Sequence, residues 1–430
     1  MKKKLLVLFL TIVSTVCLTF GLAGCDLLTE IANTGGSSSS NSSSGNSSSG
    51  SKSDDESDIE SGGEIDEAAS EGLNYKKSGS GYEVSGIGDC ADEEIVISST
   101  YNGISVVSIG DEAFKDCSSL TSVTIPDSVT SIGEYAFANC TSITSLTIPD
   151  SVTSISFGAF EYCTSLESIK LSENLSSVGN GIFIWCSALK EITIPDSVTT
   201  ICDSAFWCCQ SLESITIPKN VTTIEADAFY KCNALTEINI LGNVTSIGYG
   251  AFRYCSELRS IELPDSLTSI GTYAFYNCTY LESVKLPSNL TYISAYAFSW
   301  CESLKSITIP ESVTSIGEYA FDSCMALTSI TIPDSVTSID RCAFQQCKRL
   351  ESITIGSGVT FIGYLAFGDT PKLTTVYYSG TADEWNEISI NSDNGSLTDA
   401  TIYYYSETQP AESGNYWHYN DSGEIAIWSE

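Results

Sequence analysis

The sequence predicts an α/β solenoid, a stack of similar 23-residue units whose short strands pair side by side in a parallel sheet. Three observations predict this fold class. Phenylalanine recurs every 23 residues without an insertion, and a cysteine follows three residues after eleven of these twelve phenylalanines. Each unit also begins with a Leu-x-x-Val-x-Ile pattern, which is typical of a strand with one buried face. A fixed period of this length indicates repeats that must stack to bury their apolar residues.

Two columns of residues mark the units along the chain. We expect both columns to be buried, because a position that keeps one apolar residue in nearly every unit faces the shared core, where free cysteine behaves as a small apolar residue. The phenylalanine column consists of Phe114, Phe137, Phe160, Phe183, Phe206, Phe229, Phe252, Phe275, Phe298, Phe321, Phe344 and Phe367. The cysteine column consists of Cys117, Cys140, Cys163, Cys186, Cys209, Cys232, Cys255, Cys278, Cys301, Cys324 and Cys347.

Residues 1–24 are expected to be a lipoprotein signal peptide. Three lysines precede an apolar run from residue 5 to about residue 22, which ends in Leu-Ala-Gly-Cys25. A charged start followed by such a short run is typical of a signal peptide rather than a spanning helix. The last four residues resemble a bacterial lipobox, which implies cleavage before Cys25 and lipidation of its thiol. The alternative is an ordinary signal peptide in which Cys25 falls by chance.

Residues 25–80 are expected to hold the lipidated cysteine and a disordered linker. Residues 35–53 are almost all serine, glycine and asparagine, and residues 54–71 are acidic with few apolar side chains. Such a segment cannot bury enough apolar surface to offset its ordering entropy. A flexible linker of this length has a root-mean-square span of roughly 40 Å, so it would act as a stalk between a membrane and the folded part.

The unit that begins at Leu120 shows the expected elements in order. Residues 120–125 form a strand, and Pro126 ends its pairing because proline has no amide hydrogen. Residues 129–132 form a second, shorter extended segment that ends at Gly133. Residues 134–139 are expected to form a short helical turn that carries an Ala-Phe pair inward. With strands about 4.8 Å apart, twelve units would form a sheet roughly 60 Å long.

The ends of the repeat array are expected to be caps, because terminal repeats must shield the last core layer. Residues 81–119 form the N-terminal cap and first partial repeat, residues 120–372 form eleven repeats, and residues 373–430 form the C-terminal cap. Within this last segment, residues 376–378 and 401–405 have the pattern of strands. The aromatic residues 415–423 are expected to form a hairpin.

The repeat unit resembles the leucine-rich repeat. Its phrase Ile-Pro-Asp-Ser-Val-Thr-Ser-Ile-Gly-x-x-Ala-Phe-x-x-Cys-x-Ser-Leu is similar to the BspA-like leucine-rich repeats of bacterial surface proteins, over about residues 82–405. The resemblance implies a right-handed, horseshoe-type coil with a parallel sheet and short helical turns on its convex side. A mostly serine column, which includes Ser128 and Asn174, replaces the asparagine of the family and departs from its continuous ladder. Known members include adhesins, so the resemblance implies binding of macromolecules at a cell surface.

Composition argues against several classes of site. The net charge is -35, and loss of the first 24 residues, which hold three lysines and no acid, would make it -38. No basic face for nucleic acid is visible, and no calcium-loop motif is present. With one histidine and no Cys-x-x-Cys pair among seventeen cysteines, we expect no zinc site, and we expect no other metal and no cofactor. Four cysteines outside the column have no assigned partner: Cys90, Cys202, Cys208 and Cys342.

We expect no enzyme activity. Any Ser-His-Asp or Cys-His site would have to use the single histidine, His418. This residue lies in the aromatic terminal segment, outside the repeats. No phosphate-binding Gly-x-x-x-x-Gly-Lys motif is present. Paired carboxylates for glycoside hydrolysis depend on a distance that sequence does not give, so acidic composition alone leaves that alternative open.

Aromatic residues on the convex side are one candidate binding surface. Residues just after the phenylalanines are polar in the outer units and aromatic in the middle ones, and exposed aromatic rings suit contact with protein or glycan. The alternative is that these rings pack between neighbouring turns and cover the core. They are Tyr162, Trp185, Trp207, Tyr230, Tyr254, Tyr276 and Trp300.

The concave strand face is the other candidate. Its outward column is mostly threonine, which by itself indicates strand propensity and solubility, but concave sheets are the usual binding surfaces of solenoids. The sequence therefore predicts an exported protein, lipid-anchored on the outer face of a bacterial membrane, that binds an extracellular protein or, as the alternative, a glycan through its aromatic rings. The residues that interrupt the threonine column are Lys170, Asn239, Glu262 and Lys285.

Overall fold

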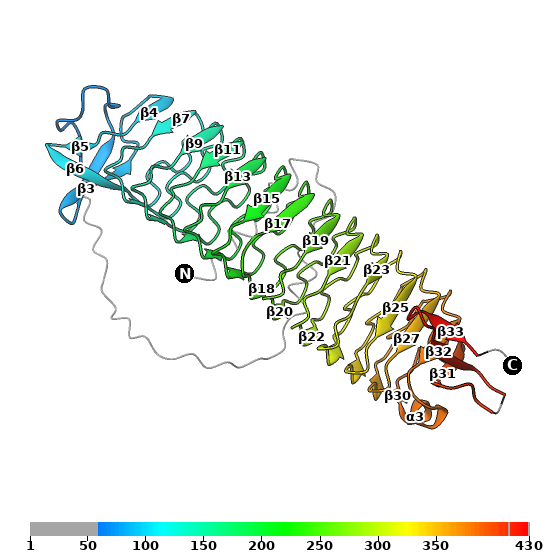
Figure 1. The fold of residues 1–430 in the computed structure, drawn as a ribbon. Coiled ribbons are helices and arrows are strands. Elements are labelled where there is room, and N and C mark those ends of the chain that lie inside the picture. The colour runs from blue at the N-terminus through cyan, green and yellow to red at the C-terminus, as the bar shows by residue number, and fades with distance from the viewer. Residues whose placement is uncertain (1–58, 412, 429–430) are drawn as a thin grey trace, which may run out of the picture. The chain divides into compact units, whose positions relative to one another are not determined.

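The computed structural model describes residues 59–411 and 413–428, which form a β-solenoid of parallel strands. The strands lie side by side from the first coil to the last, as the colour gradient in Figure 1 shows. The predicted signal peptide, Cys25 and the linker as far as residue 58 lie outside the described residues. The predicted solenoid with a 23-residue period and parallel pairing is confirmed, whereas the handedness of the coil stays a prediction.

A first ladder of strands contains one strand from each of fourteen coils, so the stack extends beyond residues 120–372 into both caps. The pairing keeps an offset of 23 residues through the repeats, as in Ser168↔Ser145. The strands are β4 (Glu94–Val96), β7 (Ser122–Thr124), β9 (Ser145–Thr147), β11 (Ser168–Lys170), β13 (Glu191–Thr193), β15 (Ser214–Ile217), β17 (Glu237–Ile240), β19 (Ser260–Glu262), β21 (Ser283–Lys285), β23 (Ser306–Ile307), β25 (Ser329–Ile332), β27 (Ser352–Ile355), β29 (Thr375–Tyr378) and β31 (Thr401–Tyr405).

A second ladder of shorter strands runs beside the first, from the extended segment that follows the proline. Hydrogen-bonded pairing is interrupted in both ladders, for example between β7 and β9, although these strands remain neighbours. The second ladder consists of β3 (Gly81–Gly86), β6 (Ile104–Ile109), β8 (Ser131–Ile132), β10 (Ser154–Ile155), β12 (Ser177–Val178), β14 (Thr200–Ile201), β16 (Thr223–Ile224), β18 (Ser246–Ile247), β20 (Ser269–Ile270), β22 (Tyr292–Ile293), β24 (Ser315–Ile316), β26 (Ser338–Ile339), β28 (Phe361–Ile362) and β30 (Ser389–Ile390).

The core lies between the ladders and the phenylalanine column. All twelve phenylalanines of the column are buried, and neighbouring rings are stacked from Phe114 to Phe367 with centroids 5.1–5.7 Å apart. In the first ladder, Val123 points inward while Ser122 and Thr124 are exposed. This alternation follows from the period of two in an extended chain. The predicted core columns are therefore confirmed, apart from Cys117, which is only half-buried.

The segments that carry the phenylalanines are turns, so the prediction of short helical turns is wrong. In all twelve units, the residues two before and two after the phenylalanine have φ between +49° and +64°, which interrupts a right-handed helix. Alternate amides then point along the stack: in one unit, the amides of Tyr135, Phe137 and Asn139 donate to carbonyls of the next unit at 2.7–3.0 Å. These bonds between coils replace the bonds within a helix.

Polar side chains at the turns also link successive coils. The Nδ2 atoms of Asn174, Asn220 and Asn289 donate to backbone carbonyls of the preceding coil at 2.7–2.9 Å. Serines in the same column do this in other units, as when Ser312 Oγ donates to the Leu290 carbonyl at 2.6 Å. Asparagine or serine therefore bonds the backbone in several units, but the buried hydroxyls of Ser151 and Ser197 have no hydrogen-bond partner, so the link is lost in those two units.

The N-terminal cap begins earlier than the sequence suggested. Strands β1 (Ile59–Glu60) and β2 (Asn74–Ser78) pair antiparallel, β2 pairs antiparallel with β3, and β5 (Thr100–Tyr101) forms a hairpin with β6. Leu73 and Tyr75 are buried, and the Tyr75 ring stacks on Tyr101 with centroids 4.2 Å apart. The prediction that the disordered linker reaches residue 80 is therefore wrong for residues 59–80, because a few apolar side chains in this polar stretch pack against the first coil.

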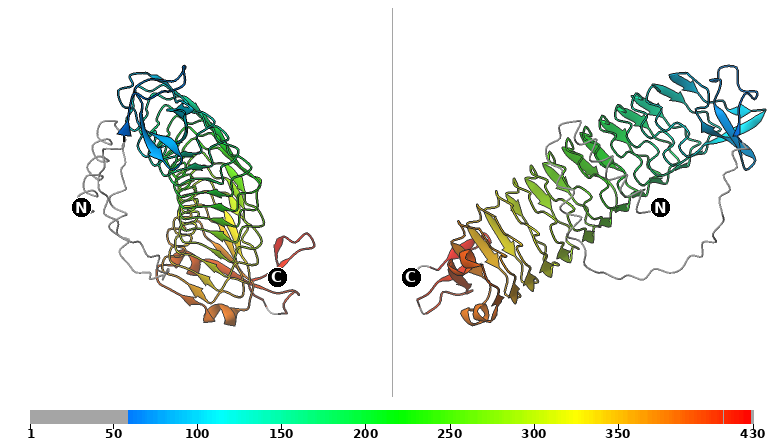
Figure 2. Two further views of the ribbon diagram at one scale, coloured as in Figure 1. Left: turned by 90° about the vertical axis from the view of Figure 1, so that its left-hand side faces the viewer. Right: turned by 180° about the vertical axis from the view of Figure 1, so that it is seen from behind.

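The C-terminal cap extends the first ladder and ends in a hairpin. Helix α3 (Ala382–Glu387), which Thr381 and Glu384 cap reciprocally, and helix α4 (Gly395–Thr398) lie between β29 and β31. Strand β32 (Tyr416–Tyr419) pairs parallel with β31 and antiparallel with β33 (Ile425–Ile427). The predicted strands at 376–378 and 401–405 and the aromatic hairpin are confirmed. In the left view of Figure 2, this hairpin stands out from the end of the stack.

Candidate functional surfaces

The strand face is the exposed side of the first ladder, and it is a polar surface made mostly of serine and threonine. Lys170, Asn239, Glu262 and Lys285 are all exposed on it, as predicted. The structure brings three of them together on neighbouring strands, because Glu262 pairs directly with Lys285 and β17 lies next to β19. Lys170 lies three strands before Asn239, or about 14 Å away at the usual strand spacing.

The C-terminal hairpin covers one end of the strand face. Trp417 is fully buried, its Nε1 atom donates to the Tyr378 carbonyl at 2.9 Å, and its ring contacts Tyr377 and Tyr405. Thr354, which continues the threonine column, is buried here. A ligand that lies on the strand face would therefore meet an aromatic wall at this end, which the sequence showed only as an aromatic terminal segment.

The predicted aromatic residues after the phenylalanines lie on the turn side, which we define as the side formed by the phenylalanine-bearing turns. Six of the seven are half-buried and Tyr230 is buried. Most pack against each other: Tyr162 stacks on Trp185 with centroids 6.0 Å apart, and Trp207 lies 4.1 Å from Tyr230. The alternative of packing between neighbouring turns therefore describes most of this group, whereas its binding role stays a prediction.

A second aromatic column, which the sequence reading missed, lies two residues before the phenylalanines. Tyr273, Tyr296 and Tyr319 are stacked with centroids 4.5 and 4.7 Å apart. The Tyr273 ring also meets Tyr276 edge to face at 5.5 Å, which joins the two groups of rings. The signal was present in the sequence, because tyrosine recurs there at the same 23-residue period.

A buried arginine organises the centre of the turn side. The guanidinium carbon of Arg253 lies 4.9–5.8 Å from the ring centroids of Tyr230, Tyr254, Tyr273 and Tyr276. Burial raises the pKa of the neighbouring Asp227 to about 6, and the positive charge of Arg253 partly offsets this rise. Cation–π attraction of this kind favours rings whose faces meet the arginine rather than solvent. These ring faces are therefore largely occupied within the protein.

Asp322 is a buried acid on the turn side, and no basic side chain contributes to the shift of its pKa. The residue is 8% exposed, and Ser299 Oγ lies 3.4 Å from its Oδ2 atom. Burial raises the pKa of the Asp322 carboxyl to about 6, and hydrogen bonds from Ser323 and Ser299 lower it only in part. Ionisation of this carboxyl therefore costs folding free energy.

The pH dependence of stability should report this cost. Because the folded pKa is above the value of about 3.9 in an unfolded chain, the protonated carboxyl stabilises the fold below about pH 4, and that stabilisation is lost as the pH rises to about 6. Asp322→Asn should thus raise the free energy of unfolding on the order of 1 kcal/mol at pH 7, allowing for solvent screening, and should change little at pH 4. Urea unfolding at both pH values, with the exposed Asp127→Asn as control, measures this difference. Equal effects of Asp322→Asn at pH 4 and pH 7 would contradict it.

The cysteine column forms a ladder of protected thiols. From Cys140 to Cys347, each of ten sulfur atoms contacts the carbonyl of the phenylalanine in the preceding coil at 3.0–3.3 Å. Burial raises the pKa of these thiols, among them Cys140, Cys186 and Cys347. Protonated and shielded thiols react poorly with oxidants, so the ladder is suited to packing rather than to redox chemistry.

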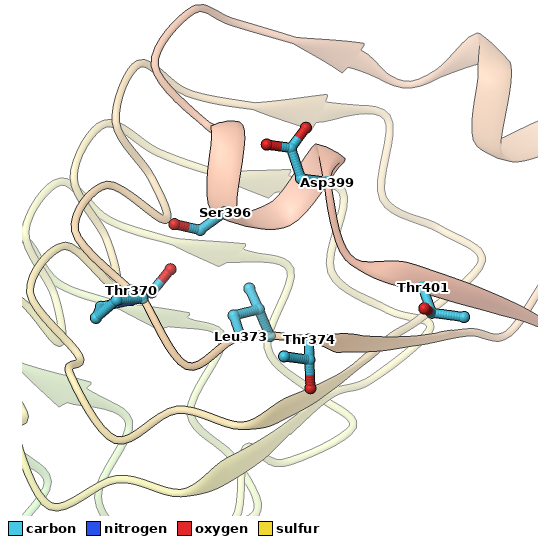
Figure 3. Close-up of a pocket in the computed structure, with 7 residues that line it drawn as sticks. Thr370, Leu373, Thr374, Ser396, Asp399 and Thr401 are labelled. Carbon is cyan, nitrogen blue, oxygen red and sulfur yellow. The ribbon is translucent and has the colours of Figure 1, made fainter.

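A pocket of about 440 Å³ lies in the C-terminal cap, between the last repeat and α4. Figure 3 shows Ser396 on α4 and Asp399 just after it, across from the segment that carries Thr370 and Thr374, with the Asp399 side chain turned away from that segment. Asp399 is the one titratable residue among the seven that line the pocket. A general acid–base pair is therefore missing from this pocket. His418 lies in the hairpin and stacks on Trp428 at 3.8 Å.

Within the part of the chain that the structure describes, no group of three or more His, Cys, Asp or Glu side chains has the geometry of a metal site. Over the same residues, none of the helices combines the length and the apolar character needed to cross a bilayer.

Comparisons with known proteins agree with this architecture. The chain is similar to a leucine-rich repeat protein from Bacteroides ovatus at 28% identity, over 78% of this chain and 98% of that chain, with a TM-score of 0.53. It is also similar to a leucine-rich cell surface protein from Faecalibacterium prausnitzii at 30% identity, over 75% of this chain and 97% of that chain, with a TM-score of 0.43. No curated protein matches the chain.

The repeat model that matches covers most of the chain. The BspA type leucine-rich repeat region matches in six copies over residues 89–212, 199–328 and 268–394. These ranges hold the phenylalanine and cysteine columns and both ladders of the repeats. The chain therefore belongs to the BspA type leucine-rich repeat family.

Proposed function

We propose that this protein is a lipid-anchored, non-catalytic protein of a bacterial cell surface that binds an extracellular protein through its strand face. The observation that carries the proposal is the exposed group of Asn239, Glu262 and Lys285 on three neighbouring strands of a face that is mostly serine and threonine. A uniform hydroxyl surface offers little discrimination between partners. A local group of amide, acid and base supplies directional, charge-assisted hydrogen bonds.

The rest of the strand face supports a protein partner. Glu237 is exposed on the same strand as Asn239, so the polar group extends across the width of the face. The strands keep a regular spacing that presents a broad surface rather than a deep pocket, and broad surfaces suit macromolecules. Membership of a family that includes bacterial surface proteins agrees with this role, and Cys25 would provide the anchor.

Carbohydrate binding through the turn side is the second candidate. The half-exposed rings of Trp185, Trp207 and Trp300 favour it, because indole rings suit contact with sugars. The ring geometry weighs against it: Tyr162 and Trp185 are stacked with a 6° angle between their planes, so each covers one face of the other. A sugar that stacks on an aromatic ring needs an open ring face.

A binding experiment with matched variants separates the two candidates. Residues 56–430 form one compact unit with its own core, which can be tested against immobilised extracellular matrix proteins and a glycan array. Replacing Asn239, Glu262 and Lys285 together by threonine restores the uniform column and should weaken protein binding at least about tenfold, or about 1.4 kcal/mol. The control Lys170→Thr, about 14 Å away, should leave affinity unchanged.

The contrary result is equally specific. If the threonine variant binds as the parent does, while Trp185→Ala with Trp207→Ala removes binding to a glycan, the turn side is the binding surface. Loss of all binding in Lys170→Thr alone would place the site outside the three neighbouring strands. Thermal unfolding of every variant should match the parent, because exposed substitutions usually change stability by less than about 0.5 kcal/mol.

A further inference from the structure

The first rung of the cysteine ladder differs from the ten that follow. Phe114 is the first phenylalanine of the column, so Cys117 has no phenylalanine carbonyl in a preceding coil to contact. Its sulfur instead lies 3.9 Å from the Lys115 carbonyl, which is a weak contact. Cys117 is also half-buried, whereas Cys140 and the later rungs are buried. The thiol at this end of the ladder is therefore the most accessible of the eleven.

The pairing of β4 with β7 places the segment that holds Cys90 next to the segment that holds Cys117 in the N-terminal cap. Strand β4 pairs parallel with β7 in the register Glu94↔Ser122. Cys90 lies four residues before β4 and Cys117 five residues before β7, so the same register brings the two lead-in segments together. The same offset aligns Cys90 with Ser118, the residue after Cys117, and paired strands lie about 4.8 Å apart, near the roughly 4.4–6.8 Å between Cα atoms that a disulfide spans.

The electrostatics agree with this placement. The pKa of the Cys117 thiol is raised first by burial, next by the charge of Asp116 and then by that of Cys90. Cys90 is half-buried like Cys117, and both are therefore within reach of a small oxidant. Among the cysteines that the structure describes, Cys202 is the one other half-buried cysteine, and the rest are buried.

We propose that Cys90 and Cys117 form a disulfide that closes the N-terminal cap onto the first repeat. The bond forms by exchange with a low-molecular-weight disulfide or a disulfide-carrying oxidoreductase outside the cytoplasm. The Cys90 thiolate attacks the oxidant and releases one thiol, and Cys117 then displaces the second thiol from the mixed disulfide. The two protein thiols lose two protons and two electrons, and the oxidant is reduced to two thiols.

The position gives the bond a mechanical role, which rests on the proposed anchoring through Cys25. The chain enters the solenoid through this cap, so a pull between the membrane and a bound partner first loads the contacts between the cap and β7. A covalent link across residues 91–116 would carry that load. The bond itself, however, is independent of anchoring and of ligand binding, so its test does not depend on the proposed function.

Peptide mapping after controlled oxidation tests the proposal. The unit 56–430 is incubated with oxidised glutathione, alkylated and digested without reduction. Mass spectrometry should find the Cys90 peptide joined to the Cys117 peptide, while Cys202, which is also half-buried, should carry glutathione alone. In Cys90→Ser, Cys117 should end as a glutathione adduct, and in Cys117→Ser the same should hold for Cys90.

Proteolysis gives a second measurement that a chance cross-link between unfolded chains would not produce. The cap of the oxidised parent should be cleaved several-fold more slowly than that of the reduced parent, and Cys90→Ser should show no such difference. The proposal is overturned if Cys90 and Cys117 in the parent remain thiols, carry separate glutathiones, or join other cysteines or other molecules.

Discussion

Replacing Phe229 by alanine is expected to lower the free energy of unfolding by about 3–5 kcal/mol. The ring is fully buried and stacked between Phe206 at 5.2 Å and Phe252 at 5.3 Å, with angles of 7° and 6° between planes. Alanine would leave a void and break both ring contacts. Because neighbouring coils stabilise each other in a repeat protein, the loss should also weaken the interfaces on either side of this coil.

Urea unfolding followed by circular dichroism measures the effect. Phe157→Ala is the matched control, because this phenylalanine lies outside the column and is 40% exposed, with one ring contact to Tyr135. Its replacement should cost less than about 1 kcal/mol. Equal midpoints for the two variants would show that the phenylalanine column does not form the core.

Trp417→Ala is expected to have an effect of similar size at the C-terminal end, about 3–5 kcal/mol. The indole is buried, it donates a hydrogen bond to the Tyr378 carbonyl, and it holds the hairpin against the strand face. Its loss should release β32 and β33 and uncover β31. An unpaired strand at the end of a sheet is a template for pairing with another chain, so the variant should associate as its concentration rises.

Thermal unfolding and light scattering measure these two effects. The control is Trp428→Ala on the same hairpin, because that indole is half-buried and stacks on His418. It donates to the Ser406 carbonyl at 2.9 Å, so its loss should cost about 1 kcal/mol without a change in association. If Trp417→Ala were no less stable than Trp428→Ala, the hairpin would not act as the cap of the stack.

The repeat architecture was predictable from the sequence because a strict period carries most of the information. Each apolar column, such as the one that contains Phe229 and the one that contains Cys232, corresponds to one position that is buried in nearly every coil. The positions of Lys170 and Lys285 on an exposed strand face followed from the alternation of the strand. A regular pattern repeated twelve times overrides the weak preferences of single residues.

The backbone of the phenylalanine turns was not predictable in the same way. The Ala-Phe-x-x-Cys spacing matches a helical turn, since it places Phe137 and Cys140 three residues apart. The left-handed residues Tyr135 and Asn139 are stabilised by hydrogen bonds to the next coil, which exist only after the coils have stacked. Local sequence preference does not contain those bonds.

For the candidate surfaces, the sequence predicted which columns of residues share a side, but it did not predict which side chains contact one another. The sequence placed Tyr230 and Tyr254 on one side, yet it did not show that Arg253 lies between several rings and occupies their faces. Nor did it show that Trp417 of the terminal hairpin donates a hydrogen bond to the Tyr378 carbonyl and is fully buried. Both depend on how side chains from different coils or from the terminal hairpin pack together, which the column pattern does not specify.

Because the 23-residue spacing is unbroken, every internal coil makes similar contacts with the coil before it and the coil after it. A gene for such a chain can therefore lose or duplicate a whole unit by recombination and still encode a closed core. The length of the solenoid can therefore change in evolution by one coil at a time, while the fold stays the same.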